Sequence, residues 1–277
     1  MMPELRPRGI GEILDTGVAL YRERFGPLIK VTLAVVIPLE ILSALVQLSA
    51  QPDEYTVGVT GTQPVYDESE FLLQIAALFV ILGVQTMGTA FVTAAATRIS
   101  ADAYVGNAED PATAVRNVGR RFFALVGLSI VVTLGVLVGF LLIVPGLVLI
   151  ALWSVAVPVL VLEGTGISAA LGRSWKLASA YFWITIGAYW TVQLLSFALT
   201  FGIAALLGLF LTTSDSSTGA VITQSVANAV SAVITTPLIA TVLVALYFDL
   251  RIRAEGFDVQ MMLMRLDSRR TDAPGDR

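Results

Sequence analysis

One stretch of the chain decides its fold: residues 122–162 read FFALVGLSIVVTLGVLVGFLLIVPGLVLIALWSVAVPVLVL, 41 residues without a charged side chain. As a helix this stretch would extend about 60 Å, twice the roughly 30 Å thickness of a bilayer's hydrocarbon core. Pro145 and Gly146 lie in its interior and favour a tight turn. The stretch therefore predicts two membrane spans, at about 123–143 and 146–162.

The composition of the whole chain agrees with a membrane protein. Of its 277 residues, 56% are hydrophobic and 14% are charged, and the mean hydropathy is +0.81. Soluble domains carry about 25% charged residues, so this chain has too few charges to cover a soluble surface. The composition excludes an ordinary soluble enzyme, a disordered chain and a nucleic-acid-binding protein with a broad basic face.

Four further apolar stretches complete the set of predicted spans. They cover about 28–48, 71–95, 183–211 and 220–247, and the polar run 212–219 separates the last two. We therefore predict an all-α integral membrane protein with six transmembrane helices arranged as three hairpins. Residues 1–258 would form a single membrane domain, and the polar tail 259–277 is expected to be disordered. The first ten residues lack the apolar region of a signal peptide.

The basic residues orient this six-span topology. All 17 Lys and Arg residues fall in the N-terminal segment, the second and fourth loops and the C-terminal tail. The charged residues of the opposite loops are all acidic. Cytoplasmic loops of membrane proteins are enriched in Lys and Arg. Both termini are therefore predicted to be cytoplasmic.

A short amphipathic segment precedes each hairpin on this predicted cytoplasmic side, and each is expected to be an interfacial helix with its apolar side toward the membrane. In the second segment, Asp110 is a candidate N-cap and Pro111 the first helical residue. The predicted apolar faces are Ile10, Leu14, Val18, Tyr21 and Phe25 in the first segment, Val115, Val118 and Phe122 in the second, and Ile167, Leu171, Trp175, Ala178 and Phe182 in the third.

The first and third amphipathic segments match at a constant offset of 157 residues. Gly9 and Ile10 align with Gly166 and Ile167, and Phe25 aligns with Phe182. Two interpretations stay open. The chain contains an internal repeat, as many membrane folds do, or amphipathic linkers of the same kind share apolar spacing by necessity.

The residues that are absent limit the chemistry. The chain has no cysteine and no histidine, which removes disulfides, thiolate nucleophiles, the usual general base and most transition-metal sites. It also has no glycine-rich phosphate loop, EF-hand loop or metalloprotease motif. We therefore predict no catalytic residues, no metal site and no cofactor.

Polar residues within the spans are the first set of candidate functional residues. Glu40 is the only carboxylate well inside a predicted span, and an intramembrane acid is a functional candidate by default. It would carry a proton or a cation, or it would be a structural residue, either protonated and bonded to a neighbouring Gln or Thr or reaching up to the outer interface. In the last span, four polar residues share one helical face, which must point at protein or water: Gln224, Asn228, Ser231 and Thr235.

The second set of candidates is a cytoplasmic motif at the end of the last span. Residues 249–258 read DLRIRAEGFD and combine charges of both signs. Gly256 is expected to end the helix. The motif would pair with Glu163 and Arg173 and fix the last helix to the third amphipathic one, or it would bind a partner or anionic headgroups. Its charged candidates are Asp249, Arg251, Arg253 and Glu255.

Three pieces of the sequence together resemble a known family. They are residues 8–25, RGIGEILDTGVALYRERF; residues 157–175, VPVLVLEGTGISAALGRSW; and residues 247–258, YFDLRIRAEGFD. They resemble the prokaryotic membrane proteins described as the membrane domain of glycerophosphoryl diester phosphodiesterase, over about residues 8–258. The resemblance implies a membrane module in a prokaryotic plasma membrane, often standing without the catalytic domain.

These observations leave three function hypotheses. The first is a non-enzymatic module that organises or assists a membrane-protein or lipid partner, with anionic lipid as one candidate and no nucleic acid. The second is a transporter or channel for a small solute, with Glu40 and the Gln224–Thr235 face lining the path. The third is a lipid-modifying enzyme, which would need a cluster of carboxylates at one interface to bind a metal.

Overall fold

The computed structural model describes residues 7–49, 68–105, 111–211 and 217–256, and within these ranges the chain forms α-helices and no strand. Six helical segments of the described chain are long and apolar enough to cross a membrane. The prediction of an all-α polytopic membrane fold is confirmed. The six segments are Phe25–Ser49, Leu72–Ala101, Phe122–Phe140, Val144–Leu162, Phe182–Gly208 and Gly219–Glu255.

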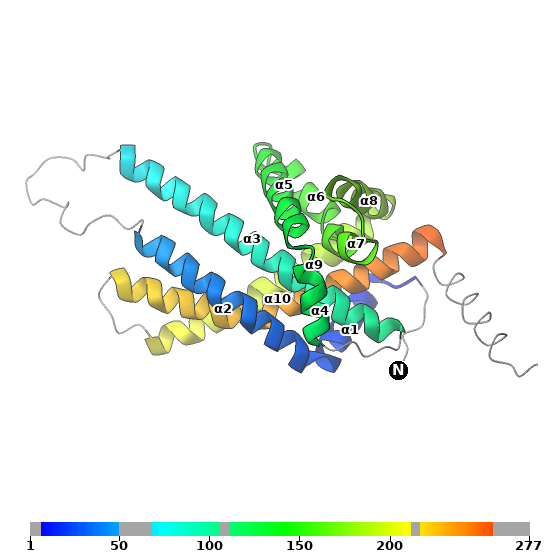
Figure 1. The fold of residues 1–277 in the computed structure, drawn as a ribbon, viewed down its shortest axis with the longest axis horizontal. Helices are drawn as coiled ribbons and strands as arrows, with labels where there is room; N and C mark the ends of the chain where they lie inside the picture. The colour runs from blue at the N-terminus through cyan, green and yellow to red at the C-terminus, as the bar shows by residue number, and fades with distance from the viewer. Residues whose placement is uncertain (1–6, 50–67, 106–110, 212–216, 257–277) are drawn as a thin grey trace, which may run out of the picture.

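Two long helices form the centre of the bundle. They are α3 (Glu68–Val105) and α10 (Ser217–Glu255), which pack against each other, and α2 (Phe25–Ser49) packs against both. Helix α9 (Phe182–Leu211) packs along α10, so that α2, α3, α9 and α10 form one group of long helices (Figure 1).

The two central helices are much longer than the predicted spans. Their 38 and 39 residues correspond to about 57 and 58 Å of helix, well beyond the roughly 30 Å hydrocarbon core. Helical hydrogen bonds do not depend on the bilayer, so each helix continues past the last apolar residue. As predicted, α10 ends before Gly256, whose φ of 58° suits glycine.

The middle hairpin differs from the prediction in two ways. The turn after α5 (Phe122–Phe140) lies at residues 141–143, before Pro145 and Gly146, which both belong to α6 (Val144–Leu152). The fourth span is also not one helix, because a break at residues 153–155 separates α6 from α7 (Ala156–Leu162).

Both differences have local causes. Proline is well tolerated in the first turn of a helix, which is where Pro145 lies in α6. Gly146 permits close packing, since a Cβ atom there would come within 2.8 Å of the Phe140 backbone nitrogen. Pro158, in the first turn of α7, lacks an N–H group for a continuous helix across the break.

Each hairpin is preceded by a short helix, as predicted: α1 (Ile10–Glu23), α4 (Pro111–Gly119) and α8 (Ile167–Ala180). The faces of α1 and α8 that pack against other helices differ in part from the apolar faces predicted to lie toward the membrane. The buried residues of α1 are Ile13, Gly17 and Leu20, whereas Phe25 is 50% exposed. The buried residues of α8 are Ala170, Ser174, Leu177 and Ala178, whereas Trp175 is 46% exposed.

Packing against other helices explains the shifted faces. Helix α1 lies against α10, and Gly17 is so close to it that a Cβ atom would come within 2.7 Å of the Cα atom of Val242. Small residues permit such close approach. Phe25 and Trp175 remain exposed, whereas Ile10 and Leu14 pack partly against the core. In α4, Val118 is buried as expected and Phe122, at the start of α5, is 39% exposed.

The offset of 157 residues extends to the structure. Helices α1 and α8 each have 14 residues and follow an extended glycine, Gly9 or Gly166. One non-helical residue then separates each from a long helix that starts at Phe25 or Phe182. Helices α1 and α8, and the starts of α2 and α9, thus correspond residue for residue. This correspondence favours the internal-repeat interpretation.

Candidate functional site

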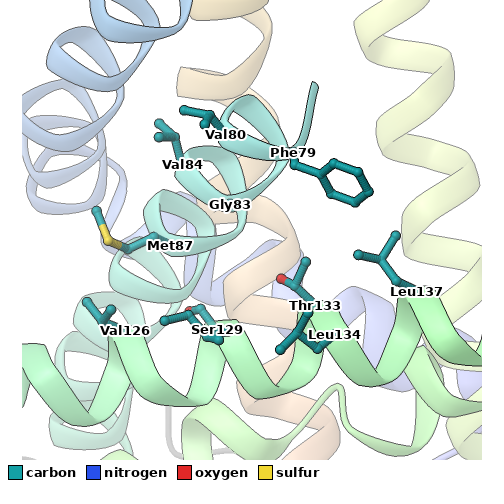
Figure 2. A pocket seen from close by; sticks show the side chains of 11 residues that line it. Phe79, Val80, Gly83, Val84, Met87, Val126, Ser129, Thr133, Leu134 and Leu137 are labelled. Atoms are coloured by element: carbon teal, nitrogen blue, oxygen red, sulfur yellow. The ribbon is translucent and has the colours of Figure 1, made fainter. Parts of the chain in front are cut away.

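An apolar groove lies between α3 and α5. It has a volume of about 420 Å³ and is lined by side chains from residues 79–87 of α3 and 126–137 of α5. Figure 2 shows these side chains on the two helices, with Phe79 and Leu137 toward one end and Met87 and Val126 toward the other. Apart from the hydroxyls of Ser129 and Thr133, the groove is lined by apolar side chains and Gly83.

Glu40 is buried between helices rather than exposed to lipid. Glu40 belongs to α2, and its Oε1 atom accepts a hydrogen bond of 2.8 Å from Nε2 of Gln85 on α3. A cavity of about 20 Å³ lies beside them, with Thr89 and Thr236 among its lining residues. A cavity of this size holds about one water molecule. The Gln partner was one of the alternatives predicted for Glu40.

The polar face predicted on the last helix does not meet Glu40. The α10 residues that line the Glu40 cavity are Ala232 and Thr236, which are not part of the predicted face. Gln224 is exposed and donates a hydrogen bond to Asn228, whereas Ser231 and Thr235 are buried. The Thr235 hydroxyl donates to the Ser231 carbonyl, one turn earlier in the same helix. These four residues therefore do not form one site with Glu40.

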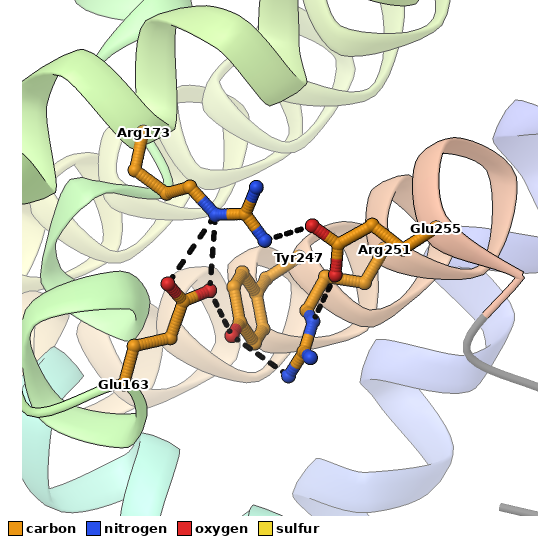
Figure 3. A network of polar contacts seen from close by, with 5 residues as sticks. All are labelled: Glu163, Arg173, Tyr247, Arg251 and Glu255. Carbon is orange, nitrogen blue, oxygen red and sulfur yellow. Dashed lines mark hydrogen bonds and ion pairs between the residues drawn. The ribbon is translucent and has the colours of Figure 1, made fainter. Parts of the chain in front are cut away.

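The charged motif at the end of α10 forms two sets of polar contacts with other parts of the chain. The first, which we name the α8–α10 clamp, consists of Glu163, Arg173, Tyr247, Arg251 and Glu255 (Figure 3). Tyr247, Arg251 and Glu255 follow one another at intervals of four residues, so they share a face of α10. Arg173 comes from α8, and Glu163 follows the end of α7.

Arg173 is the centre of the α8–α10 clamp. Its guanidinium group forms ion pairs with Glu163, at 3.3 Å from Nε to Oε2, and with Glu255. The Tyr247 hydroxyl donates to Glu163 at 3.0 Å, and Arg251 pairs with Glu255 at 3.0 Å. Two carboxylates thus face two guanidinium groups. The predicted pairing of the motif with Glu163 and Arg173 is present in the structure.

The second set, which we name the N-terminal clamp, consists of Arg8, Tyr181, Asp249 and Arg253. Asp249 is 1% exposed and accepts hydrogen bonds from the backbone N–H of Arg8, at 2.8 Å, and from Nε of Arg253, at 2.6 Å. Arg253 also donates to the Arg8 carbonyl, and the Tyr181 hydroxyl donates to the Arg253 carbonyl. This clamp fixes the segment before α1 and the junction of α8 and α9 to the end of α10.

Three residues outside the predicted candidates also take part in these sites. They are Gln85, Tyr181 and Tyr247. The spacing of Tyr247 from Arg251, one helical turn, is a signal for a shared face. Gln85 and Glu40 give no such signal, because they lie on different helices and are 45 residues apart.

Other arginines at this end of the bundle differ in their contacts. Arg98 donates to the carbonyl of Val161, and Arg121 donates to the carbonyl of Leu160, so both bind the end of α7. Basic groups are favourable at a helix C-terminus. Arg116 and Arg120 are exposed, and neither pairs with an acid among the described residues. Within the described chain, no group of three or more Asp or Glu residues is arranged to hold a metal ion.

Comparisons with known proteins add no relative. No family model matches the chain, and neither a curated protein nor a solved structure matches it.

Proposed function

We propose that this chain is a non-enzymatic polytopic membrane module that organises or assists a protein or lipid partner within the bilayer. The observation that carries the proposal is the apolar groove between α3 and α5, which offers about 420 Å³ of space on the flank of the bundle. Ligand sites are typically concave and mostly apolar.

The two clamps support a module with a rigid end. The charged residues of the motif bind one another, α8 and the N-terminal segment. Side chains held by several partners lose little further entropy when a partner docks nearby. We also propose that the chain is related to the glycerophosphoryl diester phosphodiesterase membrane domain, which it resembles, and that it lies in a prokaryotic plasma membrane. Cytoplasmic termini are proposed from the positive-inside distribution of Lys and Arg.

Extraction of the protein in native lipid discs, followed by mass spectrometry, tests this function. We expect a stoichiometric protein or an enriched lipid class beside the chain. The reference is an unrelated six-span protein extracted from the same membranes. Lipid and protein compositions equal to that reference would contradict the proposal.

A transporter or channel for a small solute is the second candidate. Its supporting observation is the buried Glu40 carboxylate beside a cavity lined by Thr89 and Thr236. Proton and cation flux into liposomes would test it, with Glu40→Gln compared with wild type. The control is Glu23→Gln, an exposed acid outside the spans. If the protein is a transporter or channel, Glu40→Gln should lower the flux and Glu23→Gln should leave it unchanged. Equal leakage in liposomes with wild type, with either variant and without protein would exclude this function.

A further inference from the structure

We propose that the α3–α5 groove holds one acyl chain of an anionic phospholipid, whose headgroup binds Arg116 and Arg120. The inference rests on the proposed function and names its lipid partner and site. The width and length of the groove and the charge at its end support the inference.

The groove is wide enough for a hydrocarbon chain and too narrow for a protein helix. Its α5 side extends from Val126 to Leu137, about 16 Å along the helix axis. Counted with the open space at its mouth, the groove contains about 890 Å³, which over that length is a mean cross-section of about 54 Å². A helix with its side chains is 10–12 Å across and needs about 80–110 Å². A transmembrane helix of a partner would rest on the groove without filling it.

The groove is about as long as one leaflet is thick, and it begins near the start of α5. Val126 lies four residues after Phe122, the first residue of α5, which places the start of the groove about 6 Å into the helix. One leaflet contributes half of the hydrocarbon core, about 15 Å. An acyl chain in the groove would therefore have its glycerol end near the start of α5.

The charge at this end of the groove suits an anionic headgroup. Arg120 lies in the junction between α4 and α5, two residues before the start of α5, and Arg116 lies four residues earlier, on α4. Both are exposed, in contrast to Arg98 and Arg121, which bind α7 carbonyls. Basic residues beside a membrane attract anionic lipid. Phe123, 86% exposed at the start of α5, is placed as an apolar anchor between them and the groove.

Gly83 provides a variant that fills the groove without disturbing the bundle. A Cβ atom at Gly83 would meet no atom within 4 Å, so the side chain of Gly83→Leu extends into free space in the groove. Gly202 on α9 is equally open and does not line the groove, so Gly202→Leu is the matched control. For the headgroup, Arg120→Gln is compared with Arg22→Gln, an exposed arginine on α1.

The experiment reconstitutes the full chain in discs of equal parts phosphatidylglycerol and phosphatidylcholine and counts the lipids retained in native mass spectra. Thermal unfolding and gel filtration select variants that fold. Wild type, Gly202→Leu and Arg22→Gln are expected to retain one phosphatidylglycerol. Gly83→Leu should lose it, and Arg120→Gln should lower the preference for phosphatidylglycerol over phosphatidylcholine about fivefold.

Two results would overturn the inference. Unchanged retention in folded Gly83→Leu would show that the lipid does not occupy the groove, and unchanged preference in Arg120→Gln would show that the arginine does not select an anionic headgroup. A protein helix cross-linked through the groove would also overturn it. In each case a protein or lipid that accompanies the chain from native membranes would leave the proposed function standing, so the two failures are distinguishable.

Discussion

Removal of Arg173 tests whether the α8–α10 clamp holds the bundle together. In Arg173→Leu, Glu163 and Glu255 lose their shared guanidinium group, and Glu255 keeps only Arg251 as a cationic partner among the described residues. Arg173 is 27% exposed, and the two carboxylates are 20% and 21% exposed. The pairs are therefore neither fully buried nor fully solvated.

The expected magnitude lies between two known limits. An exposed ion pair contributes about 0.2–1 kcal/mol, and the loss of one partner from a buried pair costs about 3–5 kcal/mol. With about three-quarters of each side chain covered, we expect Arg173→Leu to lower the free energy of unfolding by about 2 kcal/mol. Arg173→Leu combined with Glu255→Gln should then show a coupling energy of about 1 kcal/mol, because the second substitution removes one of the stranded carboxylates.

Reversible unfolding in mixed detergent and SDS micelles provides the assay. The matched control is Lys176→Leu, since Lys176 is an exposed cation on the same helix and pairs with no described acid. The control should change the free energy of unfolding by less than about 0.5 kcal/mol. Equal effects of Arg173→Leu and Lys176→Leu, together with a coupling energy below about 0.3 kcal/mol, would refute the clamp as a source of stability.

Three further predictions concern α1, Glu40 and the topology. Gly17→Ala should lower the free energy of unfolding by about 1–3 kcal/mol, because its Cβ atom would overlap Val242, whereas Gly11→Ala on the same helix meets nothing within 4 Å and should be neutral or stabilising; equal effects on unfolding would contradict the close α1–α10 contact. Glu40→Leu should cost about 1–3 kcal/mol because it strands the Gln85 amide, whereas Glu40→Gln should cost less; the reverse order would show that this hydrogen bond does not matter. Because the chain has no cysteine, single cysteines report topology cleanly: an impermeant maleimide applied to intact cells should label Ser49→Cys and spare Ser179→Cys, and the opposite pattern would reverse the orientation.

Much of the fold could be predicted because hydrophobicity sums over many residues. Each of the six spans has 19 or more residues, most of them apolar, so an error at one position changes little. The ends of the helices were less predictable, as α3 and α10 show, because the bilayer thickness sets a minimum length and no maximum. The break between α6 and α7 depends on packing around residues 153–155, where the sequence is as apolar as its surroundings.

The candidate sites divide in the same way. The pairing of Arg173 with Glu163 and Glu255 was predictable in kind, because few charged residues are available as partners in this part of the sequence. A Gln partner for Glu40 was also predictable in kind, but its identity as Gln85 and the existence of the α3–α5 groove were not. Each depends on two helices whose relative rotation the sequence does not encode locally. The predicted C-terminal tail and the last residues of the motif, from Phe257 onward, lie outside the described residues.

The sequence by itself determined the number of spans, the helical class and the clustering of positive charge at alternate loops, since each follows from composition and spacing along one segment. Only the tertiary structure decided which face of each helix is buried. Lipid tails are as apolar as a protein core, so an apolar stripe such as that of α1 does not distinguish a membrane-facing surface from a protein-facing one. The buried face of α1 consists of Ile13, Gly17 and Leu20 because α10 packs against it, although α10 is nearly 200 residues or more away in the chain.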